Sequence, residues 1–309
     1  ELKKEWEVVS STENTFPTGQ ATKRIDFVVT LKTPPTTVVK SNVIYNLDGV
    51  NVAITSDHYP LYCDFKKPTG LEEYPKAEGD LRIGNYFLTY CKGTDGVIDY
   101  DRTGRIIAKM NADIVCLQGL DKETERSEGI DQLNVLAQKA NMHDYFAKAI
   151  DYKGGEFGVG ILTKEEPVSV DRYQMAGKSE MRAAMVVEYE KFVVASTNFD
   201  TDMAKRIEAL QTLQTKLSAY NKPAFLLGYF NEGDLESEFF QMVKSNWNLL
   251  SADKSTEVSG KKRRLDFIVS LKSHNVNVTQ ADVIESLSGV DVTVASTHYP
   301  LFCDFSGLK

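Results

Sequence analysis

The sequence lacks both the apolar run of a membrane-spanning helix and the cysteine spacing of a structural metal site. A transmembrane helix needs about 20 consecutive, mostly apolar residues, and no segment of these 309 residues reaches that length. The opening Glu-Leu-Lys-Lys is not typical of a signal peptide. A structural zinc site is not expected and disulfides are not required, because no Cys-x-x-Cys pair or Cys/His cluster involves Cys63, Cys91, Cys116 or Cys303.

Positive charge is also scarce. Lysine and arginine number 36 against 44 aspartates and glutamates, which gives a formal net charge of -8. Nonspecific nucleic-acid binding depends on neutralising phosphates with a positive surface, so the composition argues against that activity. An acidic enzyme that recruits cations remains compatible with this charge. The apolar fraction of 42% is enough to fill a sizeable core.

What the sequence does contain is an internal repeat. The segment Arg24–Lys32 matches Arg264–Lys272, and Ser56–Phe65 matches Ser296–Phe305, both at the same offset of 240 positions. Two matches in one register are very improbable by chance. Residues 1–65 therefore duplicate the last part of the chain.

The repeat defines the domain organisation. Residues 66–80 are polar and contain proline and glycine, which is typical of a linker, and a complete domain follows over 81–309. The 65 residues before the linker are too few to bury a core of their own. We favour the interpretation that they are the C-terminal fragment of an upstream copy of the same fold. The alternative is an accessory sheet that packs on the complete domain or swaps between chains.

Within the complete domain, strand-like and helix-like segments alternate, which is typical of an α/β fold. The predicted helices cover 102–110, 129–140, 202–220 and 235–244. The predicted strands cover 81–88, 112–118, 157–163, 184–188, 192–197, 224–228, 265–271, 290–296 and 301–305.

Six short segments, in order, resemble the motifs of the endonuclease/exonuclease/phosphatase family, which includes deoxyribonuclease-like enzymes. They begin with Ile83–Leu88 and Ala112–Gly119 and continue with Ala195–Phe199, Leu227–Asn231, the Asp266-Phe267 strand and Ser296–His298. The resemblance implies a four-layer α/β/β/α sandwich with its site at one end of the packed sheets. In this chain that sandwich is preceded by the partial repeat of its C-terminal strands.

The resemblance also implies that most reactive positions are substituted. Phe87 stands where the family has asparagine, and Gly119 stands where it has the metal-binding glutamate. Asn198 replaces the phosphate-contacting histidine, Tyr229 the aspartate that orients the nucleophile, and Thr297 the aspartate expected to pair with the base histidine. The family's polar set is retained only at Asn231, Asp266 and His298.

These losses remove the oxygen donors that phosphoester hydrolysis needs. Mg²⁺ is held by carboxylate and amide oxygens and neutralises charge in the transition state. Gly119 and Phe87 offer no such ligand, and Tyr229 offers a neutral phenol at pH 7. We therefore expect no metal, no cofactor and no catalysis in the complete domain. The two aromatic residues are expected to fill the former cavity, and the alternative is an aromatic floor for a ligand.

The repeated fragment keeps more of the pattern. Asp26 matches Asp266, and Asp57-His58 keeps the acidic residue that Thr297-His298 has lost. If an upstream copy exists, these residues would complete its Mg²⁺-dependent site, with Asp57 orienting His58 and His58 activating water. The alternative is that Asp26 and Asp57 only satisfy local hydrogen bonds.

Three functional hypotheses follow. The first is a noncatalytic pseudoenzyme that serves as a binding or scaffold module beside an upstream copy or another protein. The second is a metal-dependent phosphodiesterase or phosphatase whose working site lies in the upstream copy. The third is a binder of phosphorylated small molecules through Asn231, Asp266 and His298. A general resemblance to phosphodiesterase-like proteins of gut and oral bacteria implies export, while the compartment stays open.

Overall fold

The computed structural model describes residues 6–32, 37–65 and 73–309, and the chain divides into two compact units at Glu72 and Glu73. Residues 66–72 of the expected linker lie outside the described residues. Residues 73–80, expected to be linker, belong to the second unit: Lys76 forms an ion pair with Asp113 at 2.7 Å, and Glu73 accepts a hydrogen bond from the Ser288 amide. None of the described helices combines the length and apolar composition that crossing a membrane requires.

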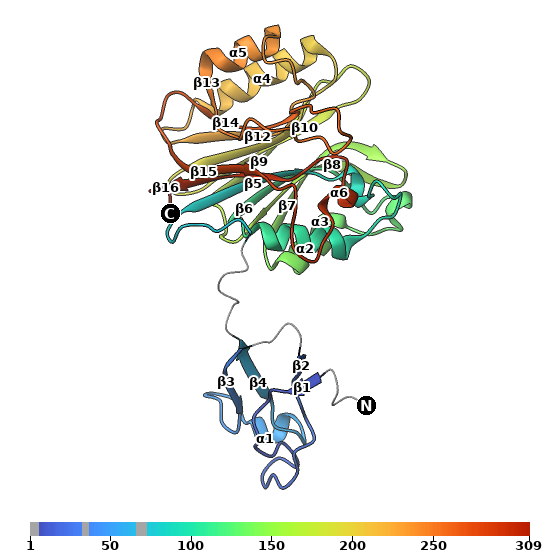
Figure 1. Ribbon diagram of the computed structural model, residues 1–309, viewed down its shortest axis with the longest axis vertical. Helices are drawn as coiled ribbons and strands as arrows, with labels where there is room; N and C mark the ends of the chain where they lie inside the picture. The colour runs from blue at the N-terminus through green and yellow to red at the C-terminus, as the bar shows by residue number, and fades with distance from the viewer. Residues whose placement is uncertain (1–5, 33–36, 66–72) are drawn as a thin grey trace. The chain divides into compact units, whose positions relative to one another are not determined.

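The second unit is built on two six-stranded sheets that lie face to face (Figure 1). The order of the first sheet is β13 (Trp247–Leu249), β14 (Asp266–Leu271), β12 (Ala224–Tyr229), β11 (Val193–Asn198), β10 (Arg182–Glu188) and β9 (Ser169–Met175). The order of the second is β15 (Asn277–Val283), β16 (Leu301–Ser306), β5 (Leu81–Phe87), β6 (Ile114–Lys122), β8 (Gly155–Thr163) and β7 (His143–Tyr152).

Helices cover the outer faces of both sheets and complete the four layers that were predicted. Figure 1 shows α4 (Met203–Leu217) and α5 (Glu238–Asn246) over the first sheet, with α2 (Tyr100–Met110) and α3 (Gln132–Ala140) under the second. The short helices η1 (Thr89–Cys91), η2 (Glu125–Ser127) and α6 (Val292–Ala295) lie in connections. Aspartate caps begin α2, α3 and α4, each accepting a hydrogen bond from an amide three residues ahead.

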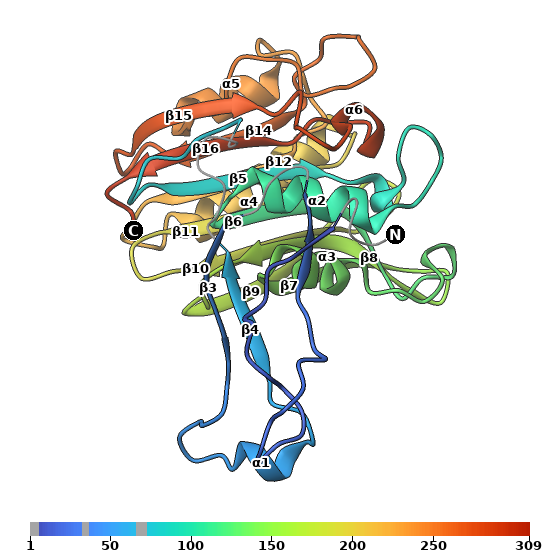
Figure 2. The ribbon, with the colours of Figure 1, turned by 60° about the horizontal axis from the view of Figure 1, so that its bottom comes forward.

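The main core lies between the sheets and holds side chains from both. Ile83, Cys116 and Ile161 of the second sheet pack with Met185 and Phe225 of the first, and all are buried. Two further cores lie under the helix layers. Figure 2 shows β15, β16 and β5 as neighbours, with α6 at the right and the C-terminus at the left.

One predicted strand is wrong. Residues 290–296, rich in β-branched side chains, form α6 instead, because Asp291 caps the turn by accepting a hydrogen bond from the Thr293 amide at 2.9 Å. The strand that precedes β16 is β15, whose polar sequence did not predict it. It is an outer strand with partly exposed side chains, so it needs no apolar face.

The first unit contains two small sheets, β1 (Trp6–Val8) with β2 (Val29–Leu31) and β3 (Val38–Val43) with β4 (Leu61–Phe65), and the short helix α1 (Val52–Thr55). Their strand registers equal those of β13 with β14 and of β15 with β16. A register shift between Val38 and Lys40 corresponds to one between Val278 and Gln280. The repeated sequences therefore have the same local structure.

Candidate active site

The substituted positions meet at one end of the two sheets. Phe87, Asn198 and Tyr229 are the last residues of β5, β11 and β12, and Asp266 is the first residue of β14. The parallel pairing of β11 with β12 places Asn198 beside Tyr229, and the antiparallel pairing of β12 with β14 places Tyr229 beside Asp266. Strand ends from both halves of the domain thus converge on one site.

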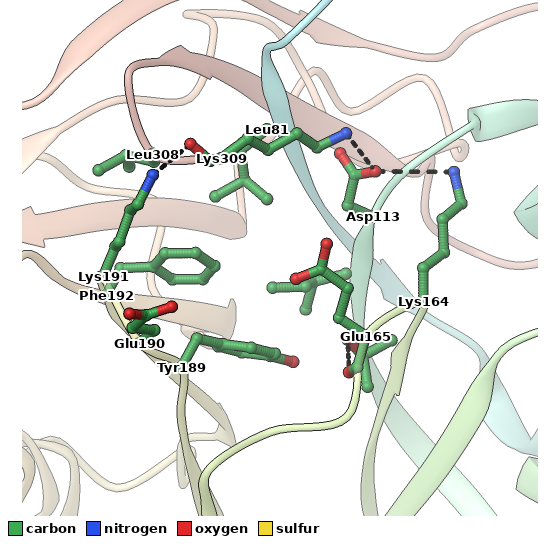
Figure 3. A pocket seen from close by; sticks show the side chains of 12 residues that line it. Leu81, Asp113, Lys164, Glu165, Tyr189, Glu190, Lys191, Phe192, Leu308 and Lys309 are labelled. Carbon is green, nitrogen blue, oxygen red and sulfur yellow. Dashed lines mark hydrogen bonds and ion pairs between the residues drawn. The ribbon is translucent and has the colours of Figure 1, made fainter.

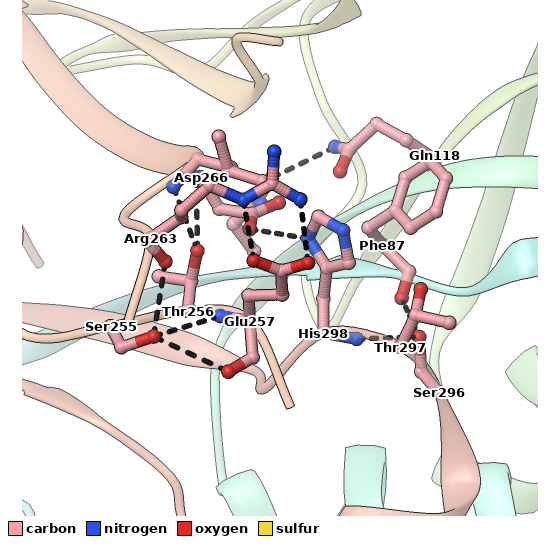
Figure 4. Close-up of polar contacts among 12 residues, drawn as sticks. Phe87, Gln118, Ser255, Thr256, Glu257, Arg263, Asp266, Ser296, Thr297 and His298 are labelled. Carbon is pink, nitrogen blue, oxygen red and sulfur yellow. Dashed lines mark hydrogen bonds and ion pairs between the residues drawn. The ribbon is translucent and has the colours of Figure 1, made fainter. Parts of the chain in front are cut away.

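An aspartate–histidine pair lies at the centre of this site (Figure 4). The Nδ1 atom of His298 lies 2.6 Å from Oδ2 of Asp266, and the side chains are 6% and 0% exposed. The expectation that position 297 supplies the acid for His298 is wrong. Thr297 is exposed, and its hydroxyl lies 3.2 Å from that of Thr89.

The same pair occurs in the first unit. Nδ1 of His58 lies 2.7 Å from Oδ2 of Asp26, so Asp26 and not Asp57 orients this histidine. Hydrogen bonds from Thr15 and His58 hold the pKa of Asp26 below its usual value. Asp57 is exposed. In both units the histidine therefore reaches an aspartate that lies 32 residues earlier in the chain.

Neighbouring side chains fix the loop that carries His298. The Ser296 hydroxyl donates to the Phe87 carbonyl at 2.6 Å and accepts from the His298 amide at 3.2 Å. Farther out, Arg263 donates two hydrogen bonds of 2.6 Å to Glu257 (Figure 4). This guanidinium lowers the pKa of Glu257 to about 2. The Glu257 carboxylate is therefore already paired with a cation.

Two aromatic rings enclose the imidazole of His298. The ring centroids of Phe87 and Tyr229 lie 4.7 Å and 4.8 Å from that of His298, and 4.7 Å from each other. Burial, and then the negative charge of Asp266, raise the pKa of the Tyr229 phenol. Tyr229 is thus neutral at pH 7, and the three rings form a packed cluster.

The Phe87 ring also occupies the space beside Gly119. Gly119 lies in a bulge of β6 with φ +74°. A Cβ atom added there would lie 3.4 Å from the Phe87 ring and 3.3 Å from the Thr89 amide nitrogen. A glutamate at position 119 would therefore need a left-handed backbone, with its Cβ crowding the Thr89 amide and in contact with the Phe87 ring.

We expect Gly119→Glu to lower the free energy of unfolding by roughly 1–3 kcal/mol, because a side chain at positive φ is strained and its Cβ lies close to the Thr89 amide and the Phe87 ring. Gly129→Glu is the matched control, since Gly129 has the same φ of +74° with nothing within 4 Å of an added Cβ. Urea denaturation of both variants measures the difference. The Phe87→Asn/Gly119→Glu double variant should recover the excess over the control, and no recovery would contradict the assigned ring contact.

A buried amide cluster beneath the rings was missed by the sequence analysis. Nε2 of Gln118 donates to Oδ1 of Asn85 at 2.8 Å and to the Ser196 hydroxyl at 3.2 Å, and all three side chains are fully buried. Asn85 lies two positions before Phe87, so it points to the same face of β5. The two-residue alternation of side chains along a strand could have shown from the sequence that Asn85 and Phe87 share a face. It places polar groups between the sheets, directly under the candidate site.

The two other asparagines of the predicted site are Asn231 and Asn198. Asn231 has a local structural role, whereas the contacts define no role for Asn198. Asn231, at φ +55°, donates its side-chain amide to the Phe199 carbonyl at 2.7 Å. Its own carbonyl accepts a hydrogen bond from Arg206 at 3.0 Å. The Asn198 Oδ1 atom is buried without a hydrogen-bond partner. Asn231 therefore ties together the loops that follow β11 and β12.

The donor set does not fit the divalent cation that the family resemblance implies. Phe87 and Gly119 present no oxygen to the site, and the Asp266 carboxylate is bound to His298. Across the described ranges, no three or more His, Cys, Asp and Glu side chains are grouped so that they could hold a metal ion. A hard cation requires several oxygen ligands, and this site offers too few.

A separate cavity of about 110 Å³ lies at the opposite end of the sheets (Figure 3). It is lined by Leu81, the first residue of β5, and by the turn between β10 and β11 around Tyr189 and Phe192. Asp113 at its rim is already paired with Lys76 at 2.7 Å and Lys309 at 2.9 Å. The cavity is therefore distinct from the site around His298.

No family model and no curated protein matches this sequence. Solved structures do match. An endonuclease/exonuclease/phosphatase from Bacteroides vulgatus is 17% identical with a TM-score of 0.61, over 74% of this chain and 99% of that one. The human Nocturnin catalytic domain, solved with bound sulfate, is 20% identical with a TM-score of 0.56, over 75% of this chain and 96% of that one.

A mannosyl-6-phosphatase from Bacteroides thetaiotaomicron is also similar, with 16% identity and a TM-score of 0.57, over 73% of this chain and 99% of that one. Identities this low establish the fold and not the activity. The endonuclease/exonuclease/phosphatase fold predicted from the motif order is therefore confirmed.

Proposed function

We propose that the second unit, which has the endonuclease/exonuclease/phosphatase fold, is a noncatalytic domain that serves as a binding or scaffold module. The observation that carries this proposal is the position of the Phe87 ring. It packs on His298 and on Tyr229 with centroid distances of 4.7 Å, and it adjoins the space that a side chain at 119 would occupy. These contacts support a site in which side chains take up the space that the family resemblance assigns to substrate and metal.

The surviving Asp266–His298 pair does not restore catalysis on its own. A histidine oriented by a carboxylate can act as a general base. Phosphoester hydrolysis also requires positive charge that stabilises the phosphate oxygens as the nucleophile attacks. No residue at 87, 119 or 229 supplies or anchors that charge. Removing one such element commonly costs two or more orders of magnitude in rate, and here several are missing together.

The test is a hydrolysis assay of the 309-residue chain with Mg²⁺ or Mn²⁺ on DNA, abasic DNA, phosphoinositides, sphingomyelin and bis-p-nitrophenyl phosphate. We expect wild type, His298→Ala and His143→Ala to show the same background rate. His143 is exposed at the start of β7 and is the matched control. Turnover that is lost in His298→Ala and kept in His143→Ala would overturn the proposal.

The second candidate is a metal-dependent phosphoester hydrolase whose site includes the first unit. The observation in its favour is that Asp26 orients His58 at 2.7 Å while Asp57, unlike Thr297, remains acidic. Within the described residues, the ring that packs on His58 is Phe16, with a centroid distance of 5.1 Å. Turnover that depends on His58 and Asp57, and not on His298, would assign catalysis to this unit.

A further inference from the structure

The first unit exposes an unusual amount of apolar surface. Most of the large apolar side chains that are exposed in the described ranges belong to its residues 6–65. They are Trp6, Val8, Ile25, Phe27, Val29, Val39, Tyr45, Leu47, Val50, Ile54 and Phe65. Such a concentration marks an interaction surface more often than a free one.

The matching residues of the second unit show how deeply such side chains are buried when neighbouring elements cover them. Phe27 is 50% exposed, whereas its counterpart Phe267 is 0% exposed. Val29 is 42% exposed and Val269 0%, and Phe65 is 42% exposed and Phe305 0%. The matched strands have the same registers, so the difference at Val29 and Phe65 does not come from their pairing. Phe27 precedes β2, whereas Phe267 lies within β14.

The covering elements are known from the second unit. There β14 pairs with β13 on one edge and with β12 on the other, and β16 pairs with β15 on one edge and with β5 on the other. Phe267 packs on Phe230 and Phe240, and Phe305 packs on Phe225. In the described part of the first unit, β2 and β4 pair only with β1 and β3, so the edges equivalent to those taken by β12 and β5 are unpaired.

The charge of Asp64 indicates which kind of side chain the partner of β4 must carry. Asp64 is exposed, whereas its counterpart Asp304 is buried in an ion pair with Arg82 of β5, with contacts of 2.6 and 2.7 Å. The strand that completes the sheet beside β4 therefore needs a cationic side chain opposite Asp64. The partner of the first unit must therefore cover an apolar face, pair with two strand edges and place one cationic side chain opposite Asp64.

We propose that the first unit is a docking surface for a segment that has the structure of residues 73–246 and precedes Glu1 in the same polypeptide. A β12-like strand pairs with β2, and a β5-like strand carrying an arginine or lysine opposite Asp64 pairs with β4. In the second unit all the covering strands precede Trp247, and α5 ends at Asn246. A preceding segment thus reaches Trp6 without a crossover connection.

A second copy of this chain is a poorer occupant. Residues 73–246 of a copy are already covered by their own residues 247–309, including the buried Arg82–Asp304 ion pair. Docking in trans would have to displace that covered segment. The proposal does not depend on whether the second unit is catalytic. It does imply that docking encloses the Asp26–His58 pair, whose side chains are now 36% exposed.

The test is amide hydrogen exchange in the 309-residue chain and in the natural polypeptide with its own N-terminal residues. Peptides covering β2 and β4 should exchange at least roughly 100-fold more slowly in the natural polypeptide, because paired strand edges are protected. Phe27→Glu should abolish that protection and leave β14 protected. Val168→Glu is the matched control, since Val168 is 67% exposed in the second unit.

Three results would overturn the proposal. Equal exchange of β2 and β4 in both polypeptides would remove the docking partner. A natural polypeptide that begins at Glu1 would contain no preceding segment that could dock on the first unit. Protection of β2 and β4 that rises with the concentration of the 309-residue chain, with a dimer in sedimentation, would assign the surface to a second copy.

Discussion

Asp304→Ala is expected to lower the free energy of unfolding of the second unit by about 3–5 kcal/mol, the range for breaking a buried ion pair by removing one partner. Arg82 is 0% and Asp304 1% exposed, and two hydrogen bonds of 2.6 and 2.7 Å join them. Arg82 also lies over the Phe302 ring at 3.9 Å. In the variant, its charge stays buried without a carboxylate.

Urea unfolding followed by the fluorescence of Trp247 measures this effect in the second unit. The chain has two tryptophans, Trp6 and Trp247, one in each unit. A Trp6→Phe background therefore isolates the signal. Asp64→Ala is the matched control and is followed through Trp6 of its own unit in a Trp247→Phe background, because Asp64 occupies the equivalent position on β4 and is exposed. We expect a change within about 0.5 kcal/mol for that surface substitution, and equal effects at the two positions would contradict the assigned burial.

The fold was predictable because its signals are ordered along the chain. Six motif segments in the family's order, and two repeated segments at one offset, do not depend on knowing the tertiary structure. The structure shows aspartate caps at Asp99, Asp131 and Asp202, at the starts of three of the helices that were predicted. The outer strands β7, β9, β13 and β15 were missed, since strands with partly exposed side chains carry no continuous apolar run.

The partner of His298 was not predictable from chain proximity. Thr297 is adjacent in sequence, yet the imidazole reaches Asp266 on a strand of the other sheet. The packing of the two sheets decides that contact, and no local pattern reports it. For the same reason the hydrogen bond between Asn85 and Gln118 was missed, although both residues lie within two positions of substituted ones.

The corrected pairing changes how the candidate site is understood. Both units have an intact Asp–His pair, so the substitutions in the second unit are concentrated on the positions to which the family resemblance assigns metal and phosphate contacts. Phe87 and Gly119 are close neighbours, because a Cβ atom added at 119 would lie in van der Waals contact with the Phe87 ring, 3.4 Å away. Substitution of Gly119 alone is therefore expected to lower the stability of the second unit. This favours the interpretation of the site as a stable packed cluster over that of a metal site that lacks a single ligand.

Phe267→Ala is the second variant with a large expected effect, about 3–5 kcal/mol of lost stability, as is usual when a phenylalanine is removed from a core. Phe267 is fully buried and packs on Phe230 and Phe240 at centroid distances of 5.1 and 4.7 Å. Its matched control is Phe27→Ala in the first unit, where half of the same ring is exposed. Urea unfolding of both variants in the 309-residue chain makes the comparison.

Phe27→Ala should cost less than about 1 kcal/mol in that chain, because little buried surface is lost. In a polypeptide that covers β2, the same substitution should approach the cost of Phe267→Ala, since the two rings would then have equivalent surroundings. A Phe27→Ala effect as large in the 309-residue chain as that of Phe267→Ala would mean that Phe27 is already covered. The difference in stability cost between Phe27→Ala and Phe267→Ala thus measures whether neighbouring strands cover β2 as they cover β14.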